Sequence, residues 1–240
     1  MTDRARTLNV LYEDNHLLAV NKEAMLPTMG VADDRESLLT VAKEYIREKY
    51  DKPGNVYLGI VSRLDAPVTG LVLLARTSKS AARLSESFRS HAVRKRYLAV
   101  VEGTPTEPTA TLEHYLRKDE RHRKVHVTNA AADGAQLARL QYRVAASSGS
   151  LSLLEIELET GRKHQIRVQL SKIGHPIVGD RKYGSSQPLT LGIALHSHRL
   201  GFEHPVRREP MELEAPLPKS WRRHGGISAL LERSEGELSP

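Results

Sequence analysis

Apolar residues in the first half of the chain recur at the two spacings that are typical of strands and helices. Short apolar runs between turn residues predict strands within residues 8–22, on either side of a turn at Asp14 and Asn15, and at residues 57–60, 70–75 and 96–101. The helical spacing predicts helices at residues 37–50 and 78–90. Residues 23–35, which contain Pro27 and Gly30, are expected to form a loop.

The second half of the chain consists mainly of short runs with strand character, at residues 111–115, 124–128, 138–145, 151–158, 193–197 and 211–214. The links between these runs are mostly as short as hairpin turns, which favours antiparallel pairing. A short helix is predicted at residues 164–173, because Ile166, Leu170 and Ile173 have core spacing and Gly174 follows as a C-terminal glycine.

Many strands with few helices predict an α+β fold, built as a single domain on a mixed, mainly antiparallel sheet with flanking helices. The length of 240 residues suits such a domain, and no internal repeat or linker divides it. We expect the domain to cover residues 8–224. Residues 1–7 and 225–240 are expected to be flexible or weakly ordered tails, the second of them beginning with a short helix.

The amino-acid composition excludes several kinds of functional site. The chain has no cysteine, which excludes disulfides, a thiol nucleophile and zinc sites built from thiolates. His122 and His126 are spaced like metal ligands on a helix, but they lie among cationic side chains, so no metal site is expected. The first residues lack the apolar core of a signal peptide, and no run is long enough to span a membrane. We therefore expect a cytoplasmic protein without membrane association.

The formal net charge is +7, and the excess of cations is uneven along the chain. Three clusters hold much of it: Arg89, Arg94, Lys95 and Arg96; Arg117, Lys118, Arg121, Arg123 and Lys124; and Arg162, Lys163 and Arg167. Such clusters attract the phosphates of nucleic acids, because each neutralised phosphate releases counterions. The alternative is a basic surface that is merely solvated, and charge alone does not decide between the two.

A polar loop between two apolar strands carries the strongest candidate for chemistry. Within residues 61–70, Arg63 and Asp65 are followed by Pro67 and Gly70. Loops supported by a rigid sheet often carry functional groups. Taken alone, the same segment is also typical of a turn in which Asp65 accepts hydrogen bonds from its own backbone.

This segment resembles the signature of the RluA-type RNA pseudouridine synthases, through Arg63-Leu64-Asp65 and Gly70. Further segments match the family in the same order, at residues 95–99, 159–168, 174–180 and 195–200, and the opening residues 11–14 and 19–22 fit as well. The resemblance spans about residues 8–216. Several motifs in the right order are far more specific than any one of them.

The resemblance implies a mixed sheet with the active site in a central cleft, and a reaction without a cofactor or metal. Asp65 matches the catalytic aspartate, Tyr97 the tyrosine that packs under the target base, and Arg167 the residue that pairs with the aspartate. Arg63 matches the arginine that helps displace the target nucleotide. Substrate contacts are also expected from Leu64, Arg162, His164 and Gln165. The partner is expected to be ribosomal or transfer RNA, bound by a monomer.

Physical chemistry is consistent with these roles. A carboxylate is a competent nucleophile toward a sugar or an electron-poor ring. The guanidinium of Arg167 would keep Asp65 ionised in a partly dry cleft. Tyr97 offers a flat face and a hydroxyl group. Without the motif, Tyr97 would be a core residue of a strand, and Arg167 could equally be a surface residue of a helix.

Departures from the family pattern bear on substrate choice. Ser62 and Gln169 stand where histidine is usual, and Ala66, Pro67 and Val68 replace more polar residues. The intact catalytic residues favour an isomerase over two alternatives, a catalytically weak RNA-binding or RNA-folding module and a glycosidase, for which no paired acid is evident. Whether Asp65 attacks the sugar, attacks the base or forms a glycal by removing a sugar proton stays open at this point.

Overall fold

The computed structural model describes residues 8–30 and 35–235. The strands are β1 (Val10–Glu13), β2 (Leu17–Lys22), β3 (Gly59–Ile60), β4 (Thr69–Ala75), β5 (Arg94–Glu102), β6 (Thr109–Asp119), β7 (Lys124–Thr128), β8 (Gln136–Ser147), β9 (Leu151–Leu158), β10 (Leu195–Glu203) and β11 (Pro210–Glu214). The helices are α1 (Leu38–Lys49), α2 (Ser78–Arg89), α3 (Gln165–Lys172), the 3-10 turn η1 (Arg181–Tyr183), α4 (Lys219–Arg222) and α5 (Gly225–Glu235).

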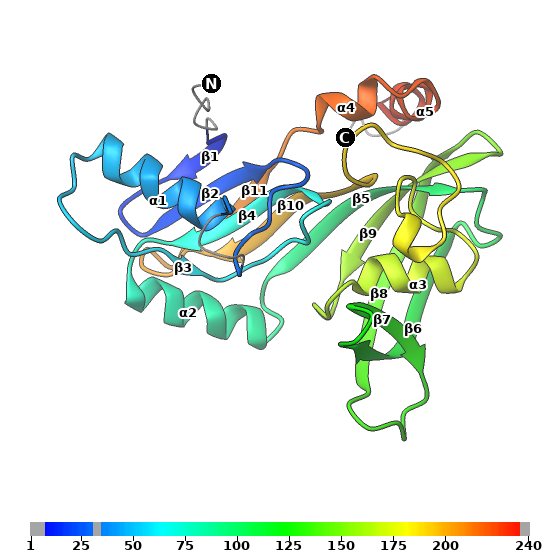
Figure 1. The fold of residues 1–240 in the computed structure, drawn as a ribbon, viewed down its shortest axis with the longest axis horizontal. Coiled ribbons are helices and arrows are strands. Elements are labelled where there is room, and N and C mark those ends of the chain that lie inside the picture. Colours follow the sequence, from blue (N-terminus) through cyan, green and yellow to red (C-terminus); the bar gives the residue numbers. More distant parts are fainter. Residues whose placement is uncertain (1–7, 31–34, 236–240) are drawn as a thin grey trace.

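The strands form one sheet in the order β1-β2-β4-β10-β5-β9-β8-β6-β7, with β3 paired to β4 and β11 paired to β10 (Figure 1). Every pair of neighbouring strands is antiparallel except β4 with β10. This arrangement confirms the predicted α+β fold with a mixed, mainly antiparallel sheet. The strands expected at residues 57–60 and 193–197 differ in extent, since β3 has two residues and β10 continues to Glu203.

Helices α1 and α2 cover opposite faces of the part of the sheet that contains β2 and β4 (Figure 1). Leu18 and Val72 pack with α1, whereas Leu17 and Leu73 pack with α2. Because both of its faces are covered, β4 is buried along its whole length, which explains its continuous apolar sequence.

The second part of the sheet is covered by α3, which lies over β6 and β7, and by α5, which lies over β8 and β9. The short helix expected at the start of the C-terminal tail is present as α5, but it is packed rather than weakly ordered, since Ile227 and Leu230 are fully buried in the core. Trp221 of α4 is buried in the same cluster. The expectation was wrong because α5 covers a sheet face that would otherwise expose apolar side chains. Residues 1–7 and 236–240 lie outside the described residues.

The two parts of the sheet meet where β10 lies between β4 and β5. Ser197 of β10 pairs with Gly70 of β4 in parallel register and with Tyr97 of β5 in antiparallel register. Gly70 has φ +110°, and a Cβ atom there would lie 2.3 Å from the carbonyl oxygen of Ser197. A glycine is therefore required for this approach. The junction brings the loop before β4 close to the middle of β5.

Candidate active site

The loop at residues 62–68, here called the catalytic loop, is fastened on both sides by hydrogen bonds. Thr28 Oγ1 donates to the Leu64 carbonyl oxygen at 2.9 Å and accepts from the Leu64 amide at 3.1 Å. The carbonyl oxygen of Ala66 accepts from the buried Lys22 Nζ at 3.1 Å and from the Met25 amide at 2.7 Å. Because the backbone of the loop is bonded to a second loop and to the end of β2, the position of Asp65 is set by the fold.

Asp65 forms the predicted ion pair with Arg167. Arg167 Nη1 donates to Asp65 Oδ2 at 2.8 Å, and the Asp65 side chain is 27% exposed. The other two donor positions of the guanidinium, Nε and Nη2, bond both carboxylate oxygens of Asp180 at 2.7 and 2.9 Å. Arg167 and Asp180 are almost fully buried, so the guanidinium is held by a bidentate partner before it reaches Asp65.

The arrangement of these charges leaves one oxygen of Asp65 without a partner. Burial alone would lower the pKa of Arg167, but the hydrogen bonds and negative charges of Asp180 and Asp65 raise it, so the guanidinium stays charged. Arg167 therefore faces two carboxylates. One guanidinium and two carboxylates leave the cluster of Arg167, Asp65 and Asp180 with a net negative charge. Among the described residues, Asp65 Oδ1 has no hydrogen-bond partner, which leaves it free to meet a reacting atom.

Tyr97 lies on β5 beside this ion pair and is partly buried against the core. Burial raises the pKa of Tyr97 to about 12; the charge of Asp65 adds to the rise, and a hydrogen bond with the Ser197 side chain opposes it. The phenol is therefore protonated at neutral pH, and its hydroxyl group can donate a proton or a hydrogen bond but is a poor base.

The remaining residues for which a substrate contact was predicted differ in how exposed they are. Arg63 is exposed and has no ion-pair partner among the described residues, and Arg162 is exposed with its Nε bonded to the Leu137 carbonyl oxygen. Leu64 is partly buried against the core. His164 has a side chain only 8% exposed, and its Nε2 lies 3.7 Å from Asp65 Oδ2.

Gln165, from which a substrate contact was expected, is bonded within the protein. Its side chain is buried, and Oε1 accepts hydrogen bonds from Thr160 Oγ1 and the Arg162 amide while Nε2 donates to the Arg139 carbonyl oxygen. These bonds shape the turn before α3 and leave little for a substrate. These bonds give Gln165 a structural role, and its predicted substrate contact stays a prediction.

Two buried residues of the site were not predicted, Asp180 and Tyr183. Ile166 and Leu170 have core spacing, so Arg167 on the same short helix could have been expected to be buried. A buried guanidinium needs hydrogen-bond partners for its remaining donors as well as an ion-pair partner. Asp180, at the end of the matching segment 174–180, was the available candidate. Tyr183 lies in a 3-10 turn with no periodic pattern, and no local signal indicated it.

Two departures from the family pattern have structural explanations. Ser62 Oγ accepts a hydrogen bond from the Leu73 amide of β4 at 2.9 Å. Gln169 is fully buried, and its Nε2 donates to the carbonyl oxygens of Leu112 and Ala138, which ties α3 to β6 and β8. Both side chains therefore serve the fold in this chain.

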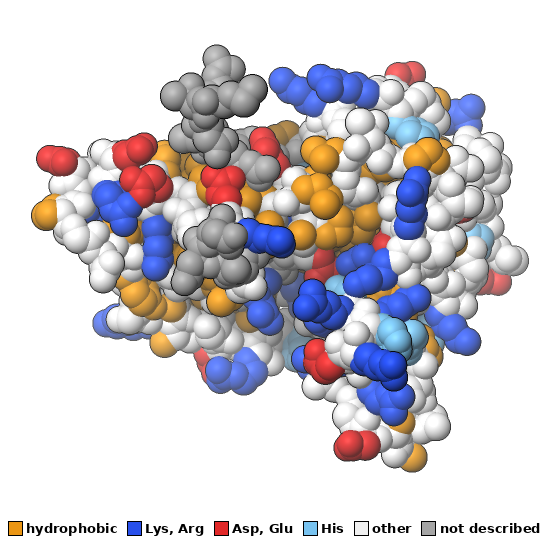
Figure 2. All heavy atoms as spheres, in the orientation of Figure 1, with side chains coloured by type: hydrophobic (Ala, Val, Ile, Leu, Met, Phe, Trp, Pro, Cys, Tyr) orange, Lys and Arg blue, Asp and Glu red, His pale blue; other side chains and the backbone are white. Residues whose placement is uncertain are grey.

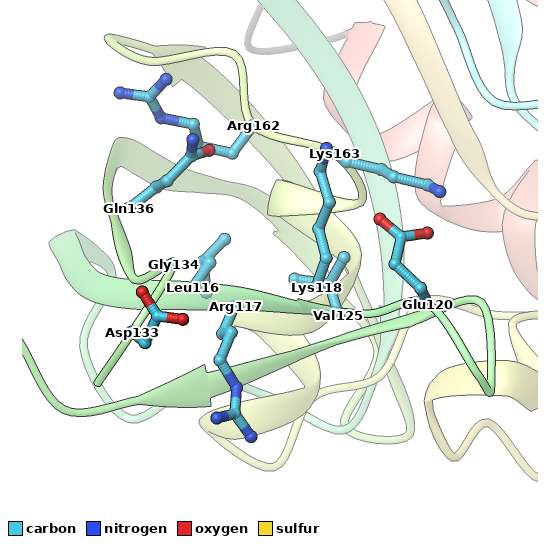
Figure 3. A pocket seen from close by; sticks show the side chains of 10 residues that line it. All are labelled: Leu116, Arg117, Lys118, Glu120, Val125, Asp133, Gly134, Gln136, Arg162 and Lys163. Atoms are coloured by element: carbon cyan, nitrogen blue, oxygen red, sulfur yellow. The ribbon is translucent and has the colours of Figure 1, made fainter.

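The outer part of β6 and all of β7 form a hairpin that projects from the sheet, here called the basic hairpin (residues 115–128) (Figure 1). Figure 2 shows Lys and Arg side chains gathered over this hairpin and over the surface beside it. A pocket of about 450 Å³ lies at its base, lined among others by Arg117, Lys118, Arg162 and Lys163 (Figure 3). Cations from β6 and from the loop before α3 thus line a common space, together with the carboxylates of Glu120 and Asp133.

Two further observations concern the residues that the structure describes. No group of three or more potential metal ligands is present among them, and His122 instead pairs with Asp119 at 2.8 Å. No helix in this part of the chain combines the length and the apolar character needed to cross a bilayer.

Comparisons with known proteins give a consistent result. A family model described as RNA pseudouridylate synthase matches residues 16–172. A Bacillus subtilis protein named as an uncharacterized RNA pseudouridine synthase, YjbO, is 32% identical over 88% of this chain and 73% of its own length. The ribosomal large subunit pseudouridine synthase D of Zymomonas mobilis is 33% identical over 88% of this chain and 70% of its own length. The solved structure of human RNA pseudouridylate synthase domain containing 4 matches with a TM-score of 0.75 and 25% identity, over 95% of this chain and 93% of that one.

Proposed function

This chain belongs to the RNA pseudouridylate synthase family, of the RluA type, and we propose that it isomerises specific uridines of large-subunit ribosomal RNA with Asp65 as the nucleophile. A pseudouridine synthase is an isomerase: it breaks the N-glycosidic bond of uridine, rotates the uracil and rejoins it to the sugar through C5. The conversion therefore needs a protein group that activates the sugar or the uracil while the two are separated.

The observation that carries the assignment of Asp65 is its asymmetric environment. Oδ2 is held by Arg167 at 2.8 Å, whereas Oδ1 has no hydrogen-bond partner among the described residues. An ionised carboxylate with one free oxygen can attack C1′ of the ribose, attack C6 of the uracil, or remove a sugar proton to give a glycal. All three routes require Asp65 to be negatively charged and to have an oxygen, here Oδ1, that can reach the substrate.

Tyr97 and Arg63 fit the handling of the target base. The ring of Tyr97, beside Asp65, offers a surface on which an extruded uracil can stack, and its protonated hydroxyl can serve as an acid. Extrusion of a base from a helix costs a few kcal/mol. Arg63 is exposed on the catalytic loop, two residues before Asp65, and can fill or bridge the space that the base leaves.

RNA is held by the basic hairpin and by the pocket at its base. Arg117, Lys118 and Arg162 are exposed there and free to approach phosphates. The net charge of +7 favours the same partner over long range. Arg162 therefore keeps its proposed role in binding, through the RNA backbone.

Large-subunit ribosomal RNA is the proposed substrate because relatives from Zymomonas mobilis and Rickettsia prowazekii carry that subunit in their names. Unmodified transcripts of large-subunit RNA, small-subunit RNA and transfer RNA would each be incubated with the protein and mapped for pseudouridine. We expect pseudouridine in the large-subunit transcript alone. Pseudouridine confined to transfer RNA would reject the substrate, and its absence from all three would reject the activity on free RNA.

A further inference from the structure

Tyr183 is a buried residue of the 3-10 turn η1 that no part of the reaction has yet used. Its side chain contacts three elements at once. Its hydroxyl oxygen accepts from the Val125 amide of β7 at 3.0 Å and lies 2.7 Å from His164 Nδ1. Its ring lies 5.0 Å from the guanidinium carbon of Arg167 and 5.2 Å from Lys124 Nζ. Tyr183 therefore joins the basic hairpin to the residues around Asp65.

The hydrogen bonds of the Tyr183 hydroxyl favour one arrangement of the protons. The amide of Val125 can only donate, so the hydroxyl oxygen of Tyr183 is the acceptor in that bond. The hydroxyl hydrogen then remains available to His164 Nδ1, which lies 2.7 Å from the oxygen, and we infer that Nδ1 accepts it. An imidazole that accepts at Nδ1 carries its proton on Nε2 when it is neutral. That Nε2–H faces Asp65 Oδ2 across 3.7 Å.

The surroundings of His164 favour the neutral ring. Burial is the main reason that the pKa of His164 falls to about 4, and the positive charges of Arg167, Lys182 and Lys163 lower it further, against the opposing charge of Asp65. Lys124 of β7 adds a cation on the Tyr183 ring. Near neutral pH the imidazole can therefore donate a hydrogen bond to Asp65 without giving up a full proton.

We propose that Tyr183 is a positioning residue, which fixes His164 as the Nε2–H tautomer so that His164 and Arg167 together hold Asp65 Oδ2 and leave Oδ1 for the substrate. The inference rests on the proposed role of Asp65 as the nucleophile. The separation of 3.7 Å between His164 Nε2 and Asp65 Oδ2 is too long for a hydrogen bond. In this proposal the two atoms move into hydrogen-bond distance when the substrate fills the site, as is common for catalytic contacts. His164 has φ +54°, and the Tyr183 bond offsets the cost of that left-handed backbone.

The tautomer is tested directly by nitrogen-15 NMR of the histidine rings, with the His164 signals identified by their loss in His164→Asn. We expect the wild-type protein at pH 7 to show a protonated Nε2 and an unprotonated Nδ1. In Tyr183→Phe, which keeps the ring beside Arg167 but lacks the hydroxyl, we expect a mixture of tautomers. An Nδ1–H tautomer or a charged ring in the wild type would overturn the proposal. This readout does not depend on which RNA is the substrate.

The kinetic test uses tritium release from cellular RNA labelled at C5 of uracil, prepared from cells that lack the protein. Tyr183→Phe should lower kcat about tenfold, the effect of losing the hydrogen bond from His164 to the charged Asp65, with a smaller change in KM. The acid limb of the kcat profile should move to higher pH, because the lost hydroxyl had stabilised the neutral ring of His164. A kcat within twofold of the wild-type value would contradict the proposal.

Two further variants separate positioning from folding. Tyr142→Phe removes the hydroxyl of another buried tyrosine, whose Oη bonds the Glu107 carbonyl oxygen, and it should leave kcat unchanged. His164→Asn tolerates a left-handed backbone and keeps an acceptor near Tyr183, but it has no donor that reaches Asp65. If Tyr183→Phe does not fold, His164→Asn alone decides: about a tenfold loss in kcat supports the proposal, and full activity overturns it. If the wild type releases no tritium, the proposed function fails, and the NMR result still decides the tautomer.

Discussion

The charged side chains around Asp65 differ from those of the basic hairpin in their burial and in their pairing. Around Asp65, the side chains of Arg167 and Asp180 are almost fully buried and bonded to each other, and Arg167 also bonds Asp65. Arg63 of the catalytic loop is the exception, since it is exposed and has no ion-pair partner among the described residues. On the basic hairpin, Arg117 and Arg121 are exposed and have no ion-pair partner among the described residues. The first region keeps its charges in fixed positions, and the second leaves them available.

This difference corresponds to two physical tasks. A buried charge costs several kcal/mol unless its partners are well placed, so a network that tolerates such burial also holds its members rigidly. Rigid placement is what a reacting carboxylate needs. Exposed cations gain free energy from phosphates through counterion release, which requires little fixed geometry. Changes near the loop should therefore reduce turnover, and changes on the hairpin should reduce affinity.

Tyr97→Phe should have the largest effect of the changes that sharpen this comparison. The variant keeps the ring that supports the base but removes the protonated hydroxyl, and we expect kcat to fall by about 10²–10⁴-fold. RNA affinity should stay close to that of the wild type, since no phosphate contact is lost. Single-turnover kinetics together with filter binding would measure both quantities. Normal turnover would reduce Tyr97 to a packing residue.

Asp180→Asn should affect stability strongly, because it leaves the buried Arg167 with a single carboxylate. We expect the free energy of unfolding to fall by about 3 kcal/mol in denaturant titrations. Glu214→Gln is the matched control, since it breaks an exposed ion pair in which Arg199 Nε lies 2.8 Å from a Glu214 oxygen. That change should cost at most about 1 kcal/mol. Equal costs for the two variants would show that burial does not distinguish the pairs.

The combined variant Arg117→Ala, Lys118→Ala and Arg121→Ala should have the smallest effect on chemistry. We expect KM to rise about tenfold at moderate salt and the slope of log affinity against log salt to become shallower by about two, while kcat stays within twofold of the wild-type value. Lys52→Ala, just beyond the end of α1, is the control and should change neither quantity. An unchanged salt slope would remove the basic hairpin from the RNA-binding surface.

Local patterns predicted the elements of the fold more completely than their arrangement. The continuous apolar run of β4 and the core spacing of α3 were sufficient to place both elements. The parallel pairing of β4 with β10 could not be predicted, because it joins residues far apart in the sequence and depends on the close approach at Gly70. The docking of α5 was missed because it depends on a sheet face that exists only after folding.

The residues of the candidate site also fall into those that the sequence predicted and those that it did not. The pairing of Asp65 with Arg167 followed from the resemblance, and the structure contains that ion pair. Asp180 and Tyr183 were missed because their importance comes from what they contact rather than from their residue type. The structural role of Gln165 was missed for the same reason: its side-chain oxygen is bonded within the turn before α3.

The most direct test of the central assignment is tritium release by Asp65→Asn. Joining C5 of uracil to the sugar must expel the hydrogen at that carbon, so RNA with tritium there reports turnover. The substitution is nearly isosteric but removes the charge and most of the nucleophilicity. We predict that release vanishes while circular dichroism and RNA binding stay like those of the wild type. Release at a tenth of the wild-type rate or more would contradict the assignment of Asp65 as the nucleophile.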